Sequence, residues 1–274
     1  AKILQKTVAK RLSKNGESIP LIAETGGQNA MIVDSSALTE QVVLDVVSSA
    51  YDSAGQRCSA LRVLCVQEDN ADAVIQMLKG AMQQLQVGNP YLLKTDIGPV
   101  IDAEAQENIQ KHIDKMRQKG HRVHQLMRND AQDSELDAGT FITPTLIELP
   151  NLNDLEREVF GPVLHVIRFN QGSLKQLLEH INSKGYGLTM GLHTRIDETI
   201  QTVMTHAEVG NLYINRNIVG AVVGVQPFGG EGLSGTGPKA GGPIYLYRLM
   251  QNCSAKKLNK PFATGADLNP QVEF

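Results

Sequence analysis

The 274-residue chain contains no tryptophan, and only 4% of its residues are aromatic. It also lacks an excess of charge, because 26 basic and 29 acidic residues leave a formal net charge of -3. This balance gives no reason to expect binding to nucleic acid or to a membrane surface. No apolar run approaches the roughly 20 residues of a membrane-spanning helix. We expect no signal peptide, since the first residues are amphipathic and show no cleavage site.

Cysteine is scarce, and histidine lacks metal-binding spacing. Three cysteines, an odd number without framework spacing, predict reduced thiols in a cytoplasmic compartment. Cys65 lies within an apolar run and Cys253 lies in the tail, so both are interpreted as structural. The nearest histidine pair, His121 and His124, has no carboxylate or thiol arranged beside it and is expected on the surface. The sequence therefore predicts no metal site.

Strands that alternate with helices of 10 to 15 residues predict an α/β fold, with a parallel sheet covered by helices on both faces. The expected strands are residues 19–23, 29–33, 61–66, 123–127, 141–149, 163–169, 188–193 and 211–214. The expected helices are residues 1–13, 40–54, 69–86, 102–119, 173–183 and 196–207, with Thr39, Asp69 and Asp102 as caps. Residues 215–243 are rich in glycine and proline and are expected to be irregular, and residues 245–253 to be ordered.

Cys58 stands on a turn-prone, polar stretch directly before an apolar run. Most cysteines of folded proteins are buried and inert. Here the preceding Gly55, Gln56 and Arg57 place the thiol on a loop between rigid elements, and the charge of Arg57 would favour the thiolate. We therefore interpret Cys58 as a candidate nucleophile.

Glu24 follows a short apolar run and precedes two glycines. It could simply cap the next element. If the apolar run is a strand, however, Glu24 lies at the carboxyl edge of the sheet, where open α/β sheets bind ligands. Covalent catalysis by Cys58 would need a base for its hydrolytic half, and a buried glutamate can supply one. The pair Cys58 and Glu24 is the central catalytic hypothesis.

Two further stretches invite a functional interpretation. Glu158 and Phe160 directly precede a strand, so they either form a turn or offer a carboxylate to a ribose and an aromatic wall to a flat ring. Glycines 230, 232 and 235 match the dinucleotide-binding pattern G-x-G-x-x-G. No strand leads directly into them and no good helix start follows, so we reject a phosphate loop there. These glycines are expected to serve tight turns or close approach to a ligand.

Four motifs, in this order and spacing, resemble the NAD(P)-dependent aldehyde dehydrogenases over residues 1 to about 250. They are Glu24-Thr25-Gly26-Gly27, Gly55-Gln56-Arg57-Cys58, Glu158-Val159-Phe160-Gly161-Pro162, and Pro227-Phe228-Gly229-Gly230 with Ser234-Gly235. Residues 22–29 and 237–243 look more narrowly like the glutamate-semialdehyde (1-pyrroline-5-carboxylate) dehydrogenases. The greatest resemblance is to the dehydrogenase module of bacterial bifunctional enzymes that also carry an FAD-containing proline dehydrogenase.

The resemblance implies a role for each matching residue. Cys58 would attack the aldehyde, with its backbone N–H partly holding the oxyanion, hydride would pass to NAD+, and Glu24 would activate the water that releases glutamate. Gly26, Glu158 and Phe160 would belong to the cofactor site. On the substrate side, the α-carboxylate would be held by Ser59, Gly220 and Ala221. Phe228 would form an aromatic wall of the aldehyde channel.

The resemblance also implies the domain organisation and partners. Residues 1–26 would end an NAD-binding domain, residues 27–238 would form the catalytic domain, and residues 239–274 would form a C-terminal segment with a candidate oligomerisation strand. Partners would be an aldehyde substrate, upstream NAD-binding and proline dehydrogenase domains, and further copies of the enzyme, without metal or nucleic acid. The location would be cytoplasmic, or peripheral at the inner membrane through the proline dehydrogenase domain.

The chain opens in mid-helix without a cap, so we expect it to be a fragment. In the family, most of the cofactor domain and the asparagine that completes the oxyanion hole precede the general-base motif. We therefore expect the isolated chain to bind NAD poorly and to turn over little or nothing. The alternatives are a different semialdehyde dehydrogenase, an assembly module with idle motifs, or a cofactor-free thioester hydrolase or esterase that uses Cys58 and Glu24.

Overall fold

The computed structural model describes residues 1–14, 16–127, 136–222, 224–237 and 239–249. Its centre is a seven-stranded sheet in the order β3-β4-β5-β2-β1-β7-β8, in which every pairing except the antiparallel β3–β4 pair is parallel. The strands are β1 (Ala30–Val33), β2 (Val63–Gln67), β3 (Arg122–Gln125), β4 (Thr145–Leu149), β5 (Val163–Phe169), β7 (Thr189–His193) and β8 (Asn211–Ile214). A separate antiparallel pair joins β6 (Tyr186–Gly187) to β9 (Glu231–Gly232). The predicted parallel α/β sheet is confirmed.

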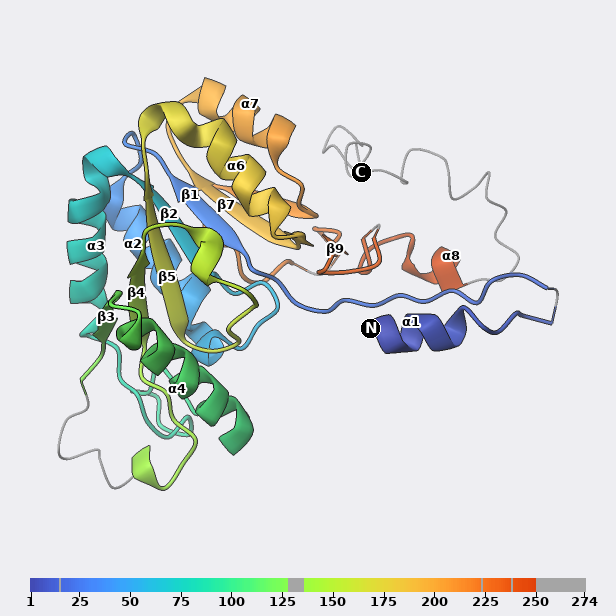
Figure 1. Ribbon diagram of the computed structural model, residues 1–274, viewed down its shortest axis with the longest axis horizontal. Helices are drawn as coiled ribbons and strands as arrows, with labels where there is room; N and C mark the ends of the chain where they lie inside the picture. The colour runs from blue at the N-terminus through green and yellow to red at the C-terminus, as the bar shows by residue number, and fades with distance from the viewer. Residues whose placement is uncertain (15, 128–135, 223, 238, 250–274) are drawn as a thin grey trace.

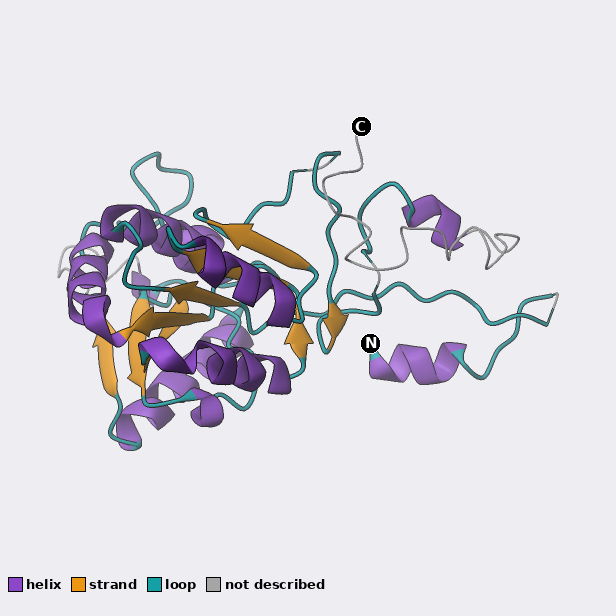
Figure 2. Ribbon diagram, turned by 90° about the horizontal axis from the view of Figure 1, so that it is seen from above, coloured by secondary structure: helices purple, strands orange, loops and turns teal. Residues whose placement is uncertain are grey.

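Helices cover both faces of the sheet (Figure 2). The body contains α2 (Thr39–Tyr51), α3 (Glu68–Met82), α4 (Ala103–Gln118), α6 (Leu174–Ser183) and α7 (Asp197–His206), with short 3-10 turns η1 (Asp52–Gly55), η2 (Leu152–Asp154) and η3 (Gln171–Ser173). Each body helix turns an apolar stripe inward; in α2, for example, Val42, Val46 and Ala50 are fully or almost fully buried. Helices α1 (Lys2–Val8) and α8 (Tyr245–Leu249) lie outside this body.

Several predicted boundaries need correction. Asp102 caps α4 as expected, since its side chain accepts a hydrogen bond from the Ala105 N–H at 2.8 Å. Thr39, however, is the first residue of α2 rather than its cap, and α3 already begins one residue before Asp69. β4 begins after Pro144, because proline has no N–H to donate to a neighbouring strand. The predicted ordered segment 245–253 extends beyond the described residues after Leu249.

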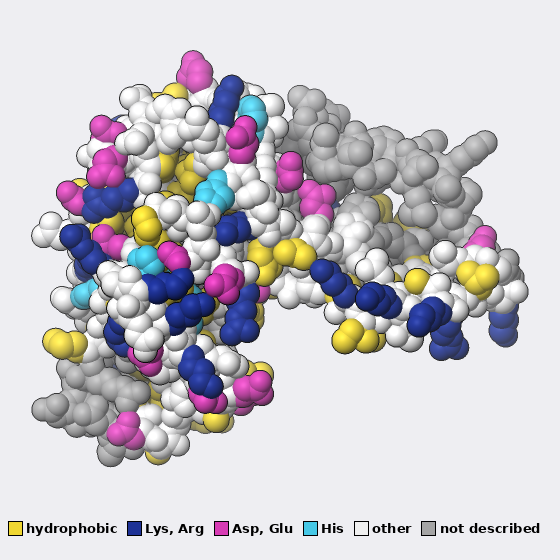
Figure 3. Space-filling model, viewed as in Figure 1, with side chains coloured by type: hydrophobic (Ala, Val, Ile, Leu, Met, Phe, Trp, Pro, Cys, Tyr) yellow, Lys and Arg dark blue, Asp and Glu magenta, His cyan; other side chains and the backbone are white. Residues whose placement is uncertain are grey.

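Residues 1–25 form an arm that runs away from the body of the molecule (Figure 1). The expected helix 1–13 is shorter, and α1 buries none of its residues, so its apolar stripe lies open. Residues 19–23 form no strand, although Glu24 makes an isolated bridge to Gly235. A strand needs a neighbour to receive its backbone hydrogen bonds, and Pro20 cannot donate one. Basic side chains lie along this arm (Figure 3).

The carboxyl edge of the sheet is filled by the protein itself. The chain leaves β1 toward β2 on one side and leaves β7 toward β8 on the other, which makes the β1–β7 junction the crevice where open sheets bind ligands. Here the buried Asp34 carboxylate accepts hydrogen bonds from the backbone N–H and the hydroxyl of Ser36 and from the hydroxyl of Thr194. Glu24 precedes β1, so its predicted placement at the carboxyl edge is wrong. The motifs lie together at the opposite, amino edge of the sheet.

A pair of histidines, of which His165 is buried and His112 half-buried, joins α4 to the sheet. The Nδ1 of His165 lies 3.0 Å from the carbonyl oxygen of Arg62, so this nitrogen carries the proton and donates it. The Nε2 of His165 then accepts from the Nε2–H of His112 at 2.9 Å. Burial lowers the pKa of His165 to about 3 and that of His112 to about 4. Both rings are therefore neutral in the folded protein near neutral pH.

Because the unfolded chain binds these protons more readily, the fold should weaken on acidification. The contribution is fully present above pH 6.5, the ordinary histidine pKa, and is lost as the pH falls toward about 4. Each suppressed protonation accounts for up to about 2 kcal/mol between pH 6.5 and about 5. His112→Gln retains an N–H donor but cannot titrate, so urea unfolding should show a smaller loss of stability in this range. His180→Gln on α6 serves as the control, and an unchanged pH dependence in His112→Gln would contradict the assignment.

None of the helices in the described part of the chain has the length and apolarity that a bilayer span requires.

Candidate functional site

Three motif segments meet at the amino edge of the sheet. Glu24, Cys58 and Glu158 each precede a parallel strand, namely β1, β2 and β5. These strands begin side by side, because Ala30 pairs with Val63 and Val63 pairs with His165. The parallel register therefore brings together residues that lie up to 134 positions apart in the sequence (Glu24 to Glu158). A sheet edge was predicted for Glu24 alone, and Glu24 lies at the opposite edge, beside the other two motif segments.

The turn before Cys58 has an unusual backbone. Ser53, Ala54 and Gly55 all have positive φ, at 55°, 53° and 64°. Such residues cost energy unless the surroundings hold them, and Gly55 also lies against the backbone of Gly161 and Ala50. The side chain of Gln56 braces the turn through hydrogen bonds with Pro99 and Ile101. The protein thus holds the loop that presents Cys58 in one geometry.

Gly55→Ala is expected to destabilise the protein by about 2–4 kcal/mol, because the new Cβ would overlap the Gly161 carbonyl and L residues disfavour this φ. Chemical denaturation measures the change. Gly80→Ala is the matched control: Gly80 lies in α3 with open space around it, so alanine there should stabilise by about 0.5–1 kcal/mol. Equal stability of the Gly55→Ala variant and the wild type would contradict the strain assigned to this turn.

Cys58 is exposed, whereas Cys65 is buried on β2 as predicted. Partial burial of the Cys58 thiol raises its pKa, the backbone N–H groups of Ser59 and Cys58 lower it, and the charges of Glu24 and Glu158 raise it. Arg57 does not contribute the expected lowering of the Cys58 pKa, and its Nε instead donates to Ser53 Oγ at 3.1 Å. Cys58 is therefore a thiol that needs a base, rather than a preformed thiolate.

Two buried residues that the sequence did not single out fix this loop. The Asn29 side chain donates to the carbonyls of Cys58 and Ala60, at 2.7 and 2.8 Å, and accepts from the Thr189 N–H. Arg62, only 1% exposed, donates to backbone carbonyls on both sides of the site and to Glu158. Their only sequence signal is a polar residue beside, or within, an otherwise apolar strand run. That signal could not reveal the partners.

The glycine-rich loop holds Glu24. The Gly230 N–H donates to Glu24 Oε2 at 2.9 Å, and the Thr25 N–H donates to the Ser234 carbonyl at 3.0 Å. A Cβ on Gly235 would lie 2.5 Å from Glu24 Oε1, so only glycine fits there. The glycines that mimic a dinucleotide fingerprint thus cradle a carboxylate, and no helix begins directly after them in the described residues 236–237 and 239–244.

Glu158, Gly26 and Phe160 form a second group. The Gly27 N–H donates to Glu158 Oε2 at 3.2 Å, and Gly26, with φ of 146°, lies so close to this oxygen that any Cβ would overlap it. Burial raises the pKa of Glu158, while the charge of Arg62 opposes the shift. Phe160 is 44% exposed, and the Arg62 guanidinium lies 5.0 Å from its ring centroid. The group offers a carboxylate and an open aromatic face.

A cavity of about 880 Å³ opens beside Cys58. Its walls include the four residues predicted to bind substrate, which are Ser59, Gly220, Ala221 and Phe228. Glu24, Gly26, Glu158 and Phe160 do not line this cavity, but Glu24 and Glu158 act on the Cys58 thiol through their charge. The predicted residues therefore form two groups, and Cys58 belongs to both.

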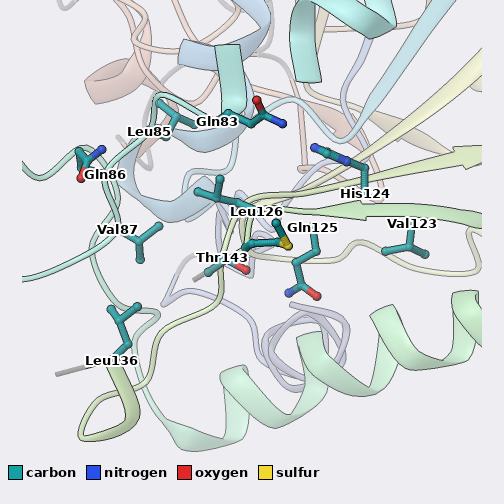
Figure 4. A pocket seen from close by; sticks show the side chains of 11 residues that line it. Gln83, Leu85, Gln86, Val87, Val123, His124, Gln125, Leu126, Leu136 and Thr143 are labelled. Atoms are coloured by element: carbon teal, nitrogen blue, oxygen red, sulfur yellow. The ribbon is translucent and has the colours of Figure 1, made fainter. Parts of the chain in front are cut away.

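A smaller cavity, of about 400 Å³, lies between the end of α3 and strand β3 (Figure 4). The prediction that His121 and His124 are surface residues needs correction there: His124 is half-buried in its wall, and burial lowers its pKa. His121 instead pairs with Asp154 at 3.1 Å. The described residues contain no group of three or more His, Cys, Asp or Glu side chains that could hold a metal ion.

Curated proteins and solved structures resemble this chain along most of its length. The Bifunctional protein PutA of Klebsiella aerogenes is 64% identical over 96% of the chain, and that of Escherichia coli K12 is 65% identical over 92%. The chain spans about a fifth of the length of these two relatives. The 1-pyrroline-5-carboxylate dehydrogenase of Geobacillus kaustophilus is 38% identical over 88% of the chain, which covers 45% of that protein.

The solved structures agree with these relatives. The crystal structure of a bifunctional proline utilization A protein matches with a TM-score of 0.83 and 50% identity, over 90% of this chain and 24% of that one. A 1-pyrroline-5-carboxylate dehydrogenase from Thermus with bound NAD matches with a TM-score of 0.78 and 34% identity, over 90% and 47%. The model of the aldehyde dehydrogenase family matches residues 4–254. The chain therefore belongs to the aldehyde dehydrogenase family.

Proposed function

We propose that this chain supplies the nucleophile, the general base and the substrate cavity of an NAD-dependent L-glutamate γ-semialdehyde dehydrogenase of proline catabolism, within a longer polypeptide. The observation that carries the proposal is the position of Cys58, which lies in the wall of a large cavity and within the field of two carboxylates. The names of the PutA and 1-pyrroline-5-carboxylate dehydrogenase relatives support the substrate.

In the first half-reaction, the Cys58 sulfur bonds to the aldehyde carbon while its proton passes to a base. Water or Glu24 can accept that proton and pass it to solvent, which leaves Glu24 ionised for the second half-reaction. The carbonyl π electrons move onto oxygen, and the Cys58 backbone N–H stabilises the resulting oxyanion. Re-formation of the carbonyl would expel hydride from this carbon and leave a thioester on Cys58, and NAD+, when bound, would supply the hydride acceptor. The chain's own contribution is to hold Cys58 on a braced turn, so that attack needs little reorganisation.

In the second half-reaction, a water molecule gives a proton to Glu24 while its oxygen adds to the thioester carbon. The C–S bond then breaks, glutamate forms and Cys58 leaves as a thiolate. The Gly230 N–H, which donates to Glu24 Oε2, holds this carboxylate in place for the step. Glu24 therefore begins the step as a base.

The cavity suits a small molecule with one charged end. We assign Ser59 and the backbone of Gly220 and Ala221 to the α-carboxylate, because all three lie in the cavity wall with Cys58. Gly220 has φ of 73°, a turn conformation that can direct backbone N–H groups at an anion. Phe228, on the same wall, would limit the width of the aldehyde channel.

The cofactor side has residues that fit a nicotinamide nucleotide. The close approach of Gly26 to Glu158 leaves no room for a side chain, and the half-exposed Phe160 ring is free to pack beside a flat group. We propose that Glu158 binds the nicotinamide ribose and Phe160 the ring, with NAD as the nucleotide. The parent protein would also carry FAD in a proline dehydrogenase domain.

We further propose that residues 1–26 complete an upstream NAD-binding domain, residues 27–238 are the catalytic domain, and residues 239–274 serve oligomerisation. The open apolar stripe of α1 supports the first assignment, because such a stripe is normally covered. The last segment extends beyond the described residues.

A steady-state assay with NAD+ and L-glutamate γ-semialdehyde tests the function. The longer polypeptide should oxidise the aldehyde, and the isolated chain should show little or no turnover. Oxidation of other semialdehydes in preference would change the substrate assignment. NAD-independent hydrolysis of an activated ester, lost in Cys58→Ser, would favour a hydrolase instead. Inactivity of both forms, together with a change in light scattering when the tail is removed, would favour an assembly module.

A further inference from the structure

We propose that Arg62 is a positioning residue with two separable tasks: its charge retains the Glu158 carboxylate in the cofactor group, and its planar fork of N–H groups holds the turn that presents Cys58. The inference rests on the proposed function, because it concerns the same two groups of residues. It goes beyond that function by naming a side chain that contacts both the turn of the nucleophile and the cofactor carboxylate.

The guanidinium of Arg62 bridges the two halves of the site. One terminal nitrogen donates to the carbonyls of Gly55 and Gly161, at 2.7 and 3.1 Å. The other donates to the carbonyl of Arg57 and to Glu158 Oε1, at 3.1 and 3.2 Å. Gly55 and Arg57 lie in the Cys58 turn, whereas Glu158 and Gly161 lie in the cofactor group. The bonds to Gly161 and Glu158 span 99 and 96 positions of sequence, so Arg62, directly before β2, ties the Cys58 turn to a distant segment.

The charge of Arg62 is needed because Glu158 is largely buried. The charged or titratable groups that act on it are Arg62 and the Cys58 thiol, and the Gly27 N–H adds a hydrogen bond. Burial raises the pKa of Glu158, and Arg62 is the cationic group that opposes this shift. Without that charge, the pKa of Glu158 would rise further, and the protonated group would be a weaker acceptor for a hydroxyl group.

The fork is needed because the Cys58 turn is strained. Three consecutive residues with positive φ persist only when the surroundings hold them. A guanidinium presents several donors in one rigid plane, whereas an ammonium is a single charged centre that cannot reproduce this geometry. The backbone of Arg62 is itself fixed, because its N–H donates to the Asn29 carbonyl and its carbonyl accepts from the His165 backbone N–H and imidazole.

Two variants separate the tasks in the longer polypeptide. Arg62→Lys keeps the charge and loses the fork, so it should lower kcat about 100-fold while KM for NAD+ changes by less than about threefold. Arg62→Met loses both, so it should lower kcat similarly and also raise KM for NAD+ about tenfold at pH 7. That rise in KM, relative to the wild type at each pH, should shrink as the pH increases and Glu158 ionises. A merely structural role would give no such pH-dependent recovery.

Arg168 provides the matched control. It lies on β5 and pairs with the carboxylates of Glu68, Asp72 and Glu148, at 3.1, 2.6 and 3.9 Å. Arg168→Lys and Arg168→Met should change neither kcat nor KM for NAD+ beyond about twofold, since these half-exposed ion pairs lie toward the carboxyl end of β5, away from the amino edge that holds the site. Equal effects at positions 62 and 168 would overturn the proposal, as would identical KM values and pH profiles in Arg62→Lys and Arg62→Met.

A readout independent of activity uses the 274-residue chain itself. Amide hydrogen exchange in residues 53–60 should rise about tenfold or more in both Arg62 variants, because the turn opens locally. Exchange in β1 should remain unchanged, which excludes global unfolding. Unchanged exchange in residues 53–60 would overturn the fork's task. If the wild-type enzyme oxidises no aldehyde, the proposed function fails, whereas the exchange result still tests Arg62.

Discussion

Replacing Cys58 by alanine is expected to lower the kcat for aldehyde oxidation by about 10⁴-fold or more, since no covalent intermediate can then form. The structure offers no substitute among the described thiols, because Cys65 is buried within β2, away from solvent. Steady-state assays of the longer polypeptide measure the effect. The fold should be retained, since Cys58 is exposed and alanine fits on its turn.

Peptide-resolved alkylation with iodoacetamide adds a second measure. Labelling of Cys58 should increase with pH, with a midpoint above the ordinary cysteine pKa, because burial raises the pKa of this thiol. Cys65 is the internal control and should remain unlabelled, since complete burial raises its pKa to about 12. Cys65→Ala should lose some stability but retain activity. Activity that survives in Cys58→Ala would mean that another group forms the acyl intermediate.

The sequence predicted most of the elements whose signals are local. The apolar stripes of α2 and α4 and the Asp102 cap appear where expected, because helix periodicity and capping depend on residues only a few positions apart. A similar apolar stripe in residues 1–13 predicted a helix longer than the observed α1, Lys2–Val8. Its packing depends on a partner surface, which a periodicity cannot reveal.

The predicted placement of Glu24 at the carboxyl edge of the sheet was wrong for a similar reason. Residues 19–23 are apolar, but a run of apolar residues becomes a strand only when a neighbour completes its hydrogen bonds. The true first strand begins at Ala30, so Glu24 precedes its strand instead of following one. The polar network of Asp34 and Thr194 then fills the carboxyl-edge crevice from within. That closure depends on contacts across 160 positions of sequence.

The role of Arg62 was not predicted from the sequence, because an arginine in an apolar run usually indicates an exposed strand position. Its burial is tolerated only because four acceptors surround it, three of them backbone carbonyls. Every residue type has a backbone carbonyl, so the sequence does not indicate which carbonyls will accept these hydrogen bonds. The residues that the motifs did identify are those whose chemistry depends on the side chain itself, such as the Cys58 thiol and the Glu24 carboxylate.

Replacing Glu24 by glutamine should separate the two half-reactions. The amide oxygen of glutamine can still accept from the Gly230 N–H, so the loop that holds position 24 should keep its geometry. Glutamine cannot accept a proton from water, so hydrolysis of the thioester should slow by about 10³-fold. If another base can deprotonate Cys58, each enzyme molecule should release one equivalent of NADH in a rapid burst and then stall.

Stopped-flow absorbance of the longer polypeptide, with aldehyde and NAD+ in excess, resolves the burst from the steady state. Glu107→Gln is the matched control, because Glu107 is exposed on α4, where it pairs only with Lys111 among the described residues, and should behave as the wild type does. A full-rate steady state in Glu24→Gln would show that another group activates the water. Loss of both the burst and the steady-state rate, with the loop around position 24 unchanged in structure, would instead make Glu24 the base for the Cys58 thiol. That outcome would fit a thiol whose pKa is raised by its surroundings, because such a nucleophile depends on a nearby carboxylate from the first step.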